Sequence, residues 1–410
     1  MTEIRRAVAL LAAATVAACS SGDGSEREAP DVTVSDSAGV EIVVSGAPPA
    51  SGMLVLAPEP EVSIGEFESE DPEQQLHRVT GAMLLDDGTI VVANEGSSQL
   101  RFFDALSGEF MRAAGGPGGG PGEFTSMRWL GRTAGDTILV YDMMNNRLSR
   151  FAPSGEFVND VTINAGGPGA QMFGLLDDGT LLLRSTVMLT AGEDPSGLIR
   201  PTATVLRADR GGVILDTLGV FPGTERVIVS AGSSESRTMA VMPPPYGRSS
   251  FMSAHDDAVA VGVSDSYEIR FLDGDGAVRR LVRRSTPPVQ VTAADRAAFT
   301  ESRLKSLPEQ LRAPFRSTLD GMTHPETMPA FLDVRFDDTG RLWVRESVNE
   351  GEMQRWAIYD RDGALEGELR LPDEFKLMSA GSDYVLGVMP DELEVERVQL
   401  LRVLRDRGRS

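Results

Sequence analysis

Cysteine and histidine are both scarce in this chain. Its 410 residues include one cysteine, Cys19, and three histidines, at positions 77, 255 and 324. A single cysteine excludes a disulfide within the chain and any metal site built from several thiolates. None of the histidines has a partner at the spacing of a local metal-binding motif. The sequence therefore predicts no metal site and no cofactor.

Catalytic motifs are missing as well. The sequence contains neither a Gly-x-Ser-x-Gly nucleophile turn nor a His-Glu-x-x-His zinc motif. We therefore predict no catalytic residues, and the sequence favours a protein that is not an enzyme.

Positive charge is in short supply. Lysine and arginine total 39 against 61 aspartates and glutamates, which gives a formal net charge of −22. Proteins that bind nucleic acid rely on clustered lysine and arginine against the phosphates. The balance therefore excludes nucleic acid as an expected partner, and it favours a solvated acidic surface that keeps the protein soluble.

Long hydrophobic runs are absent after the first eighteen residues, so no transmembrane helix is predicted. The run at 7–18 follows Arg5 and Arg6 and is too short to span a bilayer, but it suits the apolar part of a signal peptide. It ends in Val16-Ala17-Ala18-Cys19. This ending resembles the lipobox of bacterial lipoproteins.

The lipobox resemblance implies cleavage before Cys19 and acylation of that residue. A protein with two or more acyl chains is held stably on a membrane. Ser20 rather than aspartate follows the cysteine, which resembles outer-membrane sorting in cells with two membranes. We therefore expect a signal peptide at 1–18 and a lipid anchor to a bacterial membrane in the cell envelope. The polar, small-residue stretch at 19–37 is predicted to be a flexible tether.

A repeated hairpin occupies most of the remaining sequence. Its hallmark is an apolar strand, an Asp-Asp-Gly or Asp-Asp-x-Gly turn and a second apolar strand, with the turns at 86–88, 177–179 and 337–340. Weaker copies lie near 134–140, 255–261 and 380–387. Most copies are followed about twenty residues later by a second Asp-containing turn. Each unit therefore reads as four antiparallel strands, with a period of about 45 residues.

Stacking such units around an axis would bury both faces of every sheet. The last unit, from Phe375 to Leu404, supplies only three strands. We expect an N-terminal segment within 53–64 to complete it and close the ring.

The chain resembles the six-bladed β-propellers related to NHL repeats. The resemblance rests on the glycine-rich run Gly115-Gly116-Pro117-Gly118-Gly119-Gly120-Pro121-Gly122-Glu123-Phe124 and on the segments 383–388 and 391–398. It implies an all-β six-bladed propeller over 38–404, followed by a short tail at 405–410. Longer spacing in the third and fourth units departs from the family pattern.

Two insertions interrupt the repeat, at about 221–249 and 285–329. The first contains the stiff segment Met242-Pro243-Pro244-Pro245-Tyr246-Gly247. The second predicts a short helix, with Thr292 as its N-cap and Asp295 three residues later. Such insertions either form a binding face or brace neighbouring blades, and the sequence leaves both open.

Three arginines on predicted first strands could present cations to an anionic ligand in the funnel: Arg78, Arg128 and Arg335. The Asp-Asp pairs and the glycine-rich run are interpreted as turn and connector residues, because aspartate before glycine favours tight turns. The run also lacks the Lys-Ser/Thr pair of a phosphate loop.

These features predict a membrane-tethered propeller, monomeric and non-enzymatic, that binds an unknown protein or glycan partner or serves as a scaffold. The alternative is a metal-dependent enzyme of the lactonase or lyase kind, which would need several metal-ligating side chains gathered at the channel mouth. Fold alone does not decide between them.

Overall fold

The computed structural model describes residues 31–49, 52–66, 71–164, 170–186, 198–232 and 237–405. Strands dominate this part of the chain, and they form small four-stranded antiparallel sheets arranged as in a β-propeller. The signal peptide and Cys19 lie outside the described residues.

The repeat found in the sequence appears as sheet units numbered along the chain. Units 1 and 2 contain β5 (Val79–Leu84), β6 (Thr89–Asn94), β7 (Gln99–Asp104), β8 (Phe110–Gly115), β9 (Met127–Arg132), β10 (Ile138–Asp142), β11 (Arg147–Phe151) and β12 (Phe157–Thr162). Units 3 and 4 contain β13 (Gln171–Leu175), β14 (Leu181–Thr186), β16 (Thr202–Ala208), β17 (Ile214–Pro222), β20 (Ser250–His255), β21 (Ala258–Val263), β22 (Glu268–Leu272) and β23 (Val278–Arg284). Unit 5 contains β24 (Phe331–Phe336), β25 (Leu342–Glu346), β26 (Gln354–Tyr359) and β27 (Leu365–Leu371), and unit 6 begins with β28 (Lys376–Ala380), β29 (Tyr384–Pro390) and β30 (Glu396–Arg405).

The first strands of these units follow one another around a ring. β5 contacts β9, β9 contacts β13, β13 contacts β20, and β20 contacts β24. Arg335 of β24 donates to the Leu377 carbonyl oxygen of β28 at 2.6 Å, and β28 contacts β5 again. The units therefore close on themselves instead of forming an open sandwich.

Each pair of neighbouring units shares a hydrophobic cluster. Ile90 and Val92 of β6 face unit 6 and pack in one cluster with Leu386. Val91 of the same strand faces unit 2 and packs with Val140. All five side chains are fully buried. The continuous apolar strands in the sequence are thus explained by burial of both sheet faces.

The Asp-Gly turns are stabilised by their own carboxylates. Asp87 accepts from the backbone N–H of Thr89 at 2.9 Å, and Asp178 accepts from that of Thr180 at 2.7 Å. Asp337 accepts in the same way from Thr339 and Arg341. Aspartate favours these turns because its short side chain can bond the backbone two residues on. These contacts agree with the structural interpretation of the Asp pairs.

The N-terminal segment completes the last unit, as the sequence predicts. β4 (Val62–Ile64) pairs antiparallel with β30, and Val62 and Ile64 enter the cluster between units 6 and 1. β3 (Met53–Leu56) lies between β27 and β30 and joins unit 5 to unit 6 in one sheet. A strand near the beginning of the described chain and its last strand therefore pair in one unit.

The prediction of a flexible tether at 19–37 is wrong for its C-terminal part. Residues expected to be flexible form β1 (Val32–Ser37), which pairs with β2 (Val40–Ser45) through a turn at Ala38-Gly39. β2 in turn runs parallel to β23 and extends unit 4 outward. β1 is short, rich in serine and aspartate, and mostly exposed. Its composition predicts disorder. Pairing with β2 nevertheless orders it.

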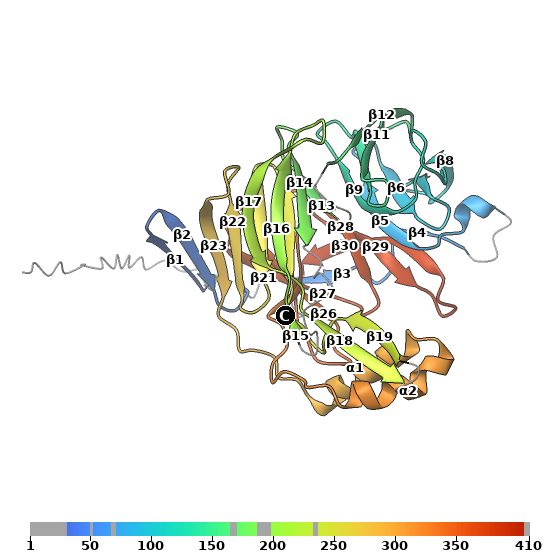
Figure 1. The fold of residues 1–410 in the computed structure, drawn as a ribbon. Coiled ribbons are helices and arrows are strands. Elements are labelled where there is room, and N and C mark those ends of the chain that lie inside the picture. Colours follow the sequence, from blue (N-terminus) through green and yellow to red (C-terminus); the bar gives the residue numbers. More distant parts are fainter. Residues whose placement is uncertain are drawn as a thin grey trace, which may run out of the picture.

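The two insertions and a short strand that precedes them form a lobe. We define it as β15 (Leu198–Ile199), β18 (Arg226–Gly232), β19 (Arg237–Met242), α1 (Ala293–Lys305) and α2 (Glu309–Asp320). β18 pairs with β15 and β19, and α2 contacts β18. Leu304, Phe315 and Leu319 form its small core. Figure 1 shows this lobe beneath the larger body of sheets.

The helix predicted in the second insertion is present. Thr292 caps α1, and its hydroxyl and the Asp295 carboxylate form a reciprocal capping box. A second helix, α2, was not predicted from the sequence. It contains Pro314 and follows Pro308, which has no side-chain capping hydrogen bond. In the described part of the chain no helix has the length and apolar character needed to cross a membrane.

Candidate binding surface at the mouth of the ring

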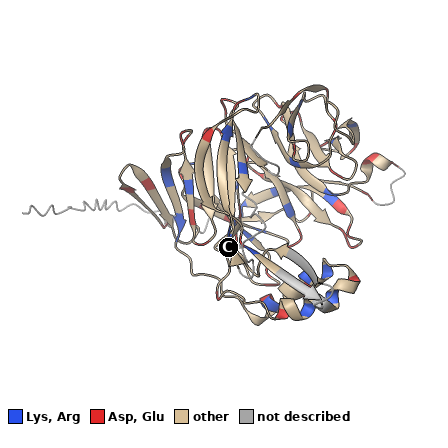
Figure 2. Ribbon diagram, viewed as in Figure 1, with Lys and Arg blue, Asp and Glu red and all other residues tan. Residues whose placement is uncertain are grey.

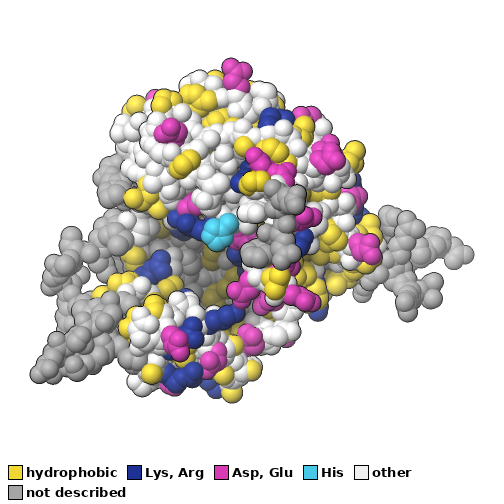
Figure 3. Space-filling model, turned by 90° about the vertical axis from the view of Figure 1, so that its right-hand side faces the viewer, with side chains coloured by type: hydrophobic (Ala, Val, Ile, Leu, Met, Phe, Trp, Pro, Cys, Tyr) yellow, Lys and Arg dark blue, Asp and Glu magenta, His cyan; other side chains and the backbone are white. Residues whose placement is uncertain are grey.

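Both insertions leave the body at the same end, which we call the mouth. The first departs after β17 and returns at β20, and the second departs after β23 and returns at β24. The lobe therefore lies at the end where the first strands begin. Figure 3 shows a hollow between the body and the lobe, with basic side chains along its edges.

Two contacts hold the lobe across part of the mouth. Near the start of α1, Asp295 accepts from the side chain of Asn349 at 2.9 Å and from the backbone N–H of Glu350 at 2.7 Å, both after β25 in unit 5. At the end of α1, Lys305 lies 3.2 Å from Glu394, between β29 and β30 in unit 6. α1 therefore extends from unit 5 to unit 6 above the ring.

Two of the three predicted arginines come together at the mouth. Arg78 donates to Glu95 at 3.0 Å, and Arg128 of unit 2 lies 3.6 Å from the same carboxylate oxygen. The Glu95 side chain is buried, whereas the side chains of Arg78 and Arg128 are 58% and 42% exposed. One buried carboxylate thus orients two solvent-facing cations, which leaves a positive charge at the interface of units 1 and 2.

The third predicted arginine lies apart from this pair. Arg335 pairs with Asp333 on its own strand and bonds the backbone of β28. Its guanidinium carbon lies 5.4 Å from the centre of the Trp356 ring. These contacts place Arg335 between units 5 and 6 and occupy its donors with protein acceptors.

Sequence reasoning missed two further arginines at the mouth. Arg184 of β14 and Arg345 of β25 stand at the same distance along their strands from the turn glycines Gly179 and Gly340. Aligning the repeats on those glycines would have revealed the match. Each arginine lies near the C-terminal end of its strand, and both strands run toward the mouth. Each therefore places a cation at the mouth.

Neither of these two arginines is closely paired with a carboxylate. Arg345 lies 4.0 Å from the exposed Asp373, and burial lowers its pKa although Asp373 and Asp333 oppose this. Arg184 bonds only neutral acceptors in the described chain, namely the Gln171 side chain and the Ser250 carbonyl oxygen. The mouth is therefore richer in uncompensated positive charge than the net charge of −22 suggests.

A polar cluster lies at the opposite end of the ring. Arg132 of unit 2 lies 2.7 Å from Asp86 of unit 1 and 3.6 Å from Asp338 of unit 5. Asp338 also accepts from the Tyr384 hydroxyl at 2.5 Å. Burial raises the pKa of Asp338, although the Tyr384 hydrogen bond and the Arg132 charge oppose this. Side chains from well-separated units thus meet at this end of the axis.

The histidines do not converge. His77 lies beside unit 1 at the mouth, His255 lies 3.2 Å from Asp256 at the opposite end, and His324 belongs to the lobe. Within the described ranges, no three histidine, cysteine or acidic side chains form a group that could hold a metal ion.

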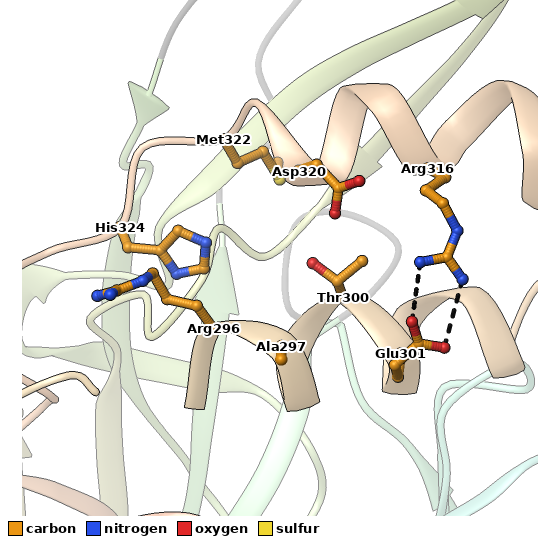
Figure 4. A pocket seen from close by; sticks show the side chains of 8 residues that line it. All are labelled: Arg296, Ala297, Thr300, Glu301, Arg316, Asp320, Met322 and His324. Atoms are coloured by element: carbon orange, nitrogen blue, oxygen red, sulfur yellow. Dashed lines mark hydrogen bonds and ion pairs between the residues drawn. The ribbon is translucent and has the colours of Figure 1, made fainter. Parts of the chain in front are cut away.

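The lobe contains a shallow cavity of about 600 Å³ between its two helices, shown in Figure 4. Arg316 and Glu301 form an ion pair at 2.8 Å on one side of it. His324 lies on the other side, near Arg296, and burial and that arginine lower the pKa of the imidazole. The cavity therefore combines charges of both signs on an open surface.

The glycine-rich run is a connector packed on unit 2. Arg147 donates to the carbonyl oxygens of Gly119, Gly120 and Glu123 at 2.6–2.9 Å. Glu123 accepts from the backbone N–H of Gly120 at 2.8 Å. Backbone carbonyls turned toward an arginine do not suit an anion site, which agrees with the interpretation from the sequence.

Over the rest of the described molecule, acidic and basic residues are interspersed along the strands (Figure 2).

No protein-family model and no curated protein matches this chain. Among solved structures, it is similar to a protein of Bacteroides fragilis that is inferred to be exported, with 13% identity and a TM-score of 0.49 over 89% of this chain and all of that one. A member of the DUF4221 family from Bacteroides vulgatus is similar at 12% identity and a TM-score of 0.48, over 87% of this chain and all of that one. Virginiamycin B lyase from Staphylococcus aureus reaches 11% identity and a TM-score of 0.38, over 86% of this chain and 96% of that one. These similarities assign neither a family nor an activity.

Proposed function

We propose that this protein is a lipid-anchored, six-bladed β-propeller of the bacterial envelope that binds a partner in the hollow between its mouth and its lobe. The partner is a protein or glycan, and the protein acts as a binding or scaffold module. The observation that carries this proposal is the placement of both insertions at one end of the ring, where they wall a hollow edged with basic side chains. Long insertions on one face of a repeat fold commonly form its binding face.

The sheet units support the proposed blade count. Four-stranded units in a ring, with a shared hydrophobic cluster between each neighbouring pair, are what propeller blades require. Counting β28, β29, β30 and β4 as one blade gives six.

A photo-crosslinking experiment tests the binding hollow. A benzophenone amino acid replaces Lys376, which is exposed at the start of β28, and the labelled protein is irradiated in intact envelopes. The matched control carries the same group at Leu106, which is 91% exposed in the outer turn of unit 1. We expect a discrete adduct from position 376 alone. No adduct from 376, or equal adducts from both positions, would remove the proposal.

The lipid anchor needs a separate test. With Cys19→Ala the lipid cannot attach, and the protein should move from the membrane fraction to the soluble fraction on cell fractionation. Retention in the membrane fraction would contradict the anchor.

A metal-dependent lyase or lactonase is the second candidate, because the propeller channel is a suitable place for a metal-bound substrate. Its required group of converging ligands is not found among the residues described. Metal analysis of the purified protein, with melting temperatures before and after chelation, tests it directly. A stoichiometric ion whose removal lowers the melting temperature would favour this candidate over a binding module.

A further inference from the structure

The first described residue, Asp31, lies beside the root of the lobe. Its carbonyl oxygen accepts from the backbone N–H of Gly46 at 2.8 Å. The carbonyl oxygen of Ser45, one residue earlier, accepts from the backbone N–H of Ser285 at 2.9 Å. Ser285 follows β23 and opens the second insertion. Because β2 runs parallel to β23, which ends at the mouth, Asp31 also lies at the mouth.

Chain length limits the distance from Asp31 to the proposed lipid anchor. Cys19 precedes Asp31 by 12 residues. A chain of that length spans at most about 40 Å when it is fully extended. β1 has six residues and measures about 20 Å from the mouth toward the opposite end of unit 4. To bring that opposite end to the membrane, the chain would have to run back over about half of its maximum reach. The entry point therefore favours an arrangement in which the mouth is nearer to the membrane.

The two ends of the ring also differ in charge. Both Asp-containing turns of a unit lie at the end opposite the mouth, because each joins a strand that leaves the mouth to one that returns to it. Carboxylates from units 1, 4 and 5 are exposed there, to 79% for Asp86, 49% for Asp256 and 91% for Asp362. The helices of the lobe instead carry five basic and four acidic residues, in a protein whose net charge is −22 (Figure 2). One of those four acids, Asp295, is buried. A surface of anionic lipids would therefore repel the acidic end more strongly than the lobe.

We propose that the mouth and the lobe face the lipid surface that carries the anchor, and that the acidic end of the ring points away from it. This rests on the proposed lipid anchor at Cys19. The point where the chain enters the body and the difference in charge between the two ends both favour this orientation. The hollow between mouth and lobe then opens toward the lipid headgroups, so a partner in the hollow is held close to the membrane.

Energy transfer from a dye on the protein to a labelled lipid tests this orientation. Cys19 is the only cysteine and carries the lipid in the anchored protein, so a cysteine introduced elsewhere supplies the single free thiol. The donor dye is attached at Met144→Cys of unit 2 or at Leu393→Cys of unit 6, two positions in mouth loops that are 65% and 73% exposed. Leu106→Cys is the matched control, because Leu106 is 91% exposed at the opposite end of unit 1. Unit 1 lies between units 2 and 6, so the control position differs from the other two chiefly along the axis of the ring.

The full-length lipidated protein is reconstituted into vesicles of phosphatidylethanolamine and phosphatidylglycerol that contain an acceptor dye on a lipid headgroup. We expect the transfer efficiency from positions 144 and 393 to exceed that from position 106, because the mouth loops lie closer to the headgroups. Equal efficiency from all three positions, or the highest efficiency from position 106, would overturn the proposal.

Flotation of the vesicles separates a wrong orientation from a missing anchor. Protein that floats with the vesicles but gives equal transfer from all positions contradicts the orientation and leaves the anchor in place. Protein that does not float removes the anchor and the orientation together. Circular dichroism melting verifies that each labelled variant is folded, and position 144 alone decides the matter if Leu393→Cys is not folded.

Discussion

At the scale of residues, several buried charges between units 4 and 5 form a balanced network. Arg284 contacts both Glu346 and Glu368, and Arg355 lies 2.7 Å from Glu346. The side chains of Arg284, Glu346 and Glu368 are each less than 10% exposed. Two arginines and two glutamates cancel, so this network joins units 4 and 5 instead of awaiting a ligand.

Breaking this network should destabilise the fold strongly. Arg284→Met leaves Glu346 and Glu368 short of a cation in a buried site, and we expect the free energy of unfolding to fall by about 3–5 kcal/mol. Arg279→Met on the same strand removes a 66%-exposed partner of Asp273 and should cost less than about 1 kcal/mol. Denaturant unfolding of both variants measures the difference, and equal losses would contradict the assignment.

A second residue-scale prediction concerns pH. Because burial raises the folded-state pKa of Asp338 above its ordinary value of 3.8, its contribution to stability is lost as the pH rises from 3.8 through the raised value. The unfolding free energy of the unaltered protein should therefore fall relative to that of Asp338→Asn over this interval.

Asp391 provides the control of opposite sign. Backbone hydrogen bonds from Val395 and Leu393, together with Arg397, hold its pKa below the ordinary value despite some desolvation. Its contribution is present above pH 3.8 and is lost as the pH falls through the lowered value. Relative to Asp391→Asn, the unaltered protein should thus gain stability as the pH rises, and the same trend for both aspartates would refute the pair of predictions.

At the scale of elements, α1 depends on a carboxylate that serves two purposes. Asp295 completes the capping box with Thr292 and also bonds Asn349 and Glu350 of unit 5. Thr292→Ala removes only the cap and should cost about 0.5–2 kcal/mol. Asp295→Ala also detaches the helix from the body, so it should cost more and should speed exchange of α1 amides. Equal exchange in both variants would show that the contact with unit 5 is not needed.

The sequence predicts some elements well because their cause is local. Asp87 and Asp178 mark hairpins through bonds to their own turns, and Thr292 with Asp295 marks a helix start. β1 and α2 were missed because their stability comes from distant partners, namely the edge of unit 4 and the lobe strand β18. The arginine candidates divide in the same way. Arg78 and Arg128 meet through Glu95, whereas Arg335 lies apart between units 5 and 6.

At the scale of the whole molecule, the ring should depend on its N-terminal strands. Of the described strands, a version that begins at residue 40 lacks only the exposed β1, and it should melt cooperatively near the temperature of the longer protein. A version that begins at residue 71 also lacks β2, β3 and β4, which exposes the edges of β23 and β30 and uncovers Val398 and Leu400. We expect its melting temperature to drop and aggregation to follow. Calorimetry and light scattering measure both, and unchanged melting of the shorter version would show that closure is dispensable.

The pairing of β4 with β30 also sets the order of events during synthesis. β4 (Val62–Ile64) has no partner until β30 (Glu396–Arg405) has been synthesised. A nascent chain can pack its earlier units against one another, but it cannot close the ring. Until β30 is made, it therefore exposes two unpaired sheet edges. Ring closure therefore waits for β30, and a chain that stops before that strand is left as an open ring whose exposed sheet edges proteases can recognise.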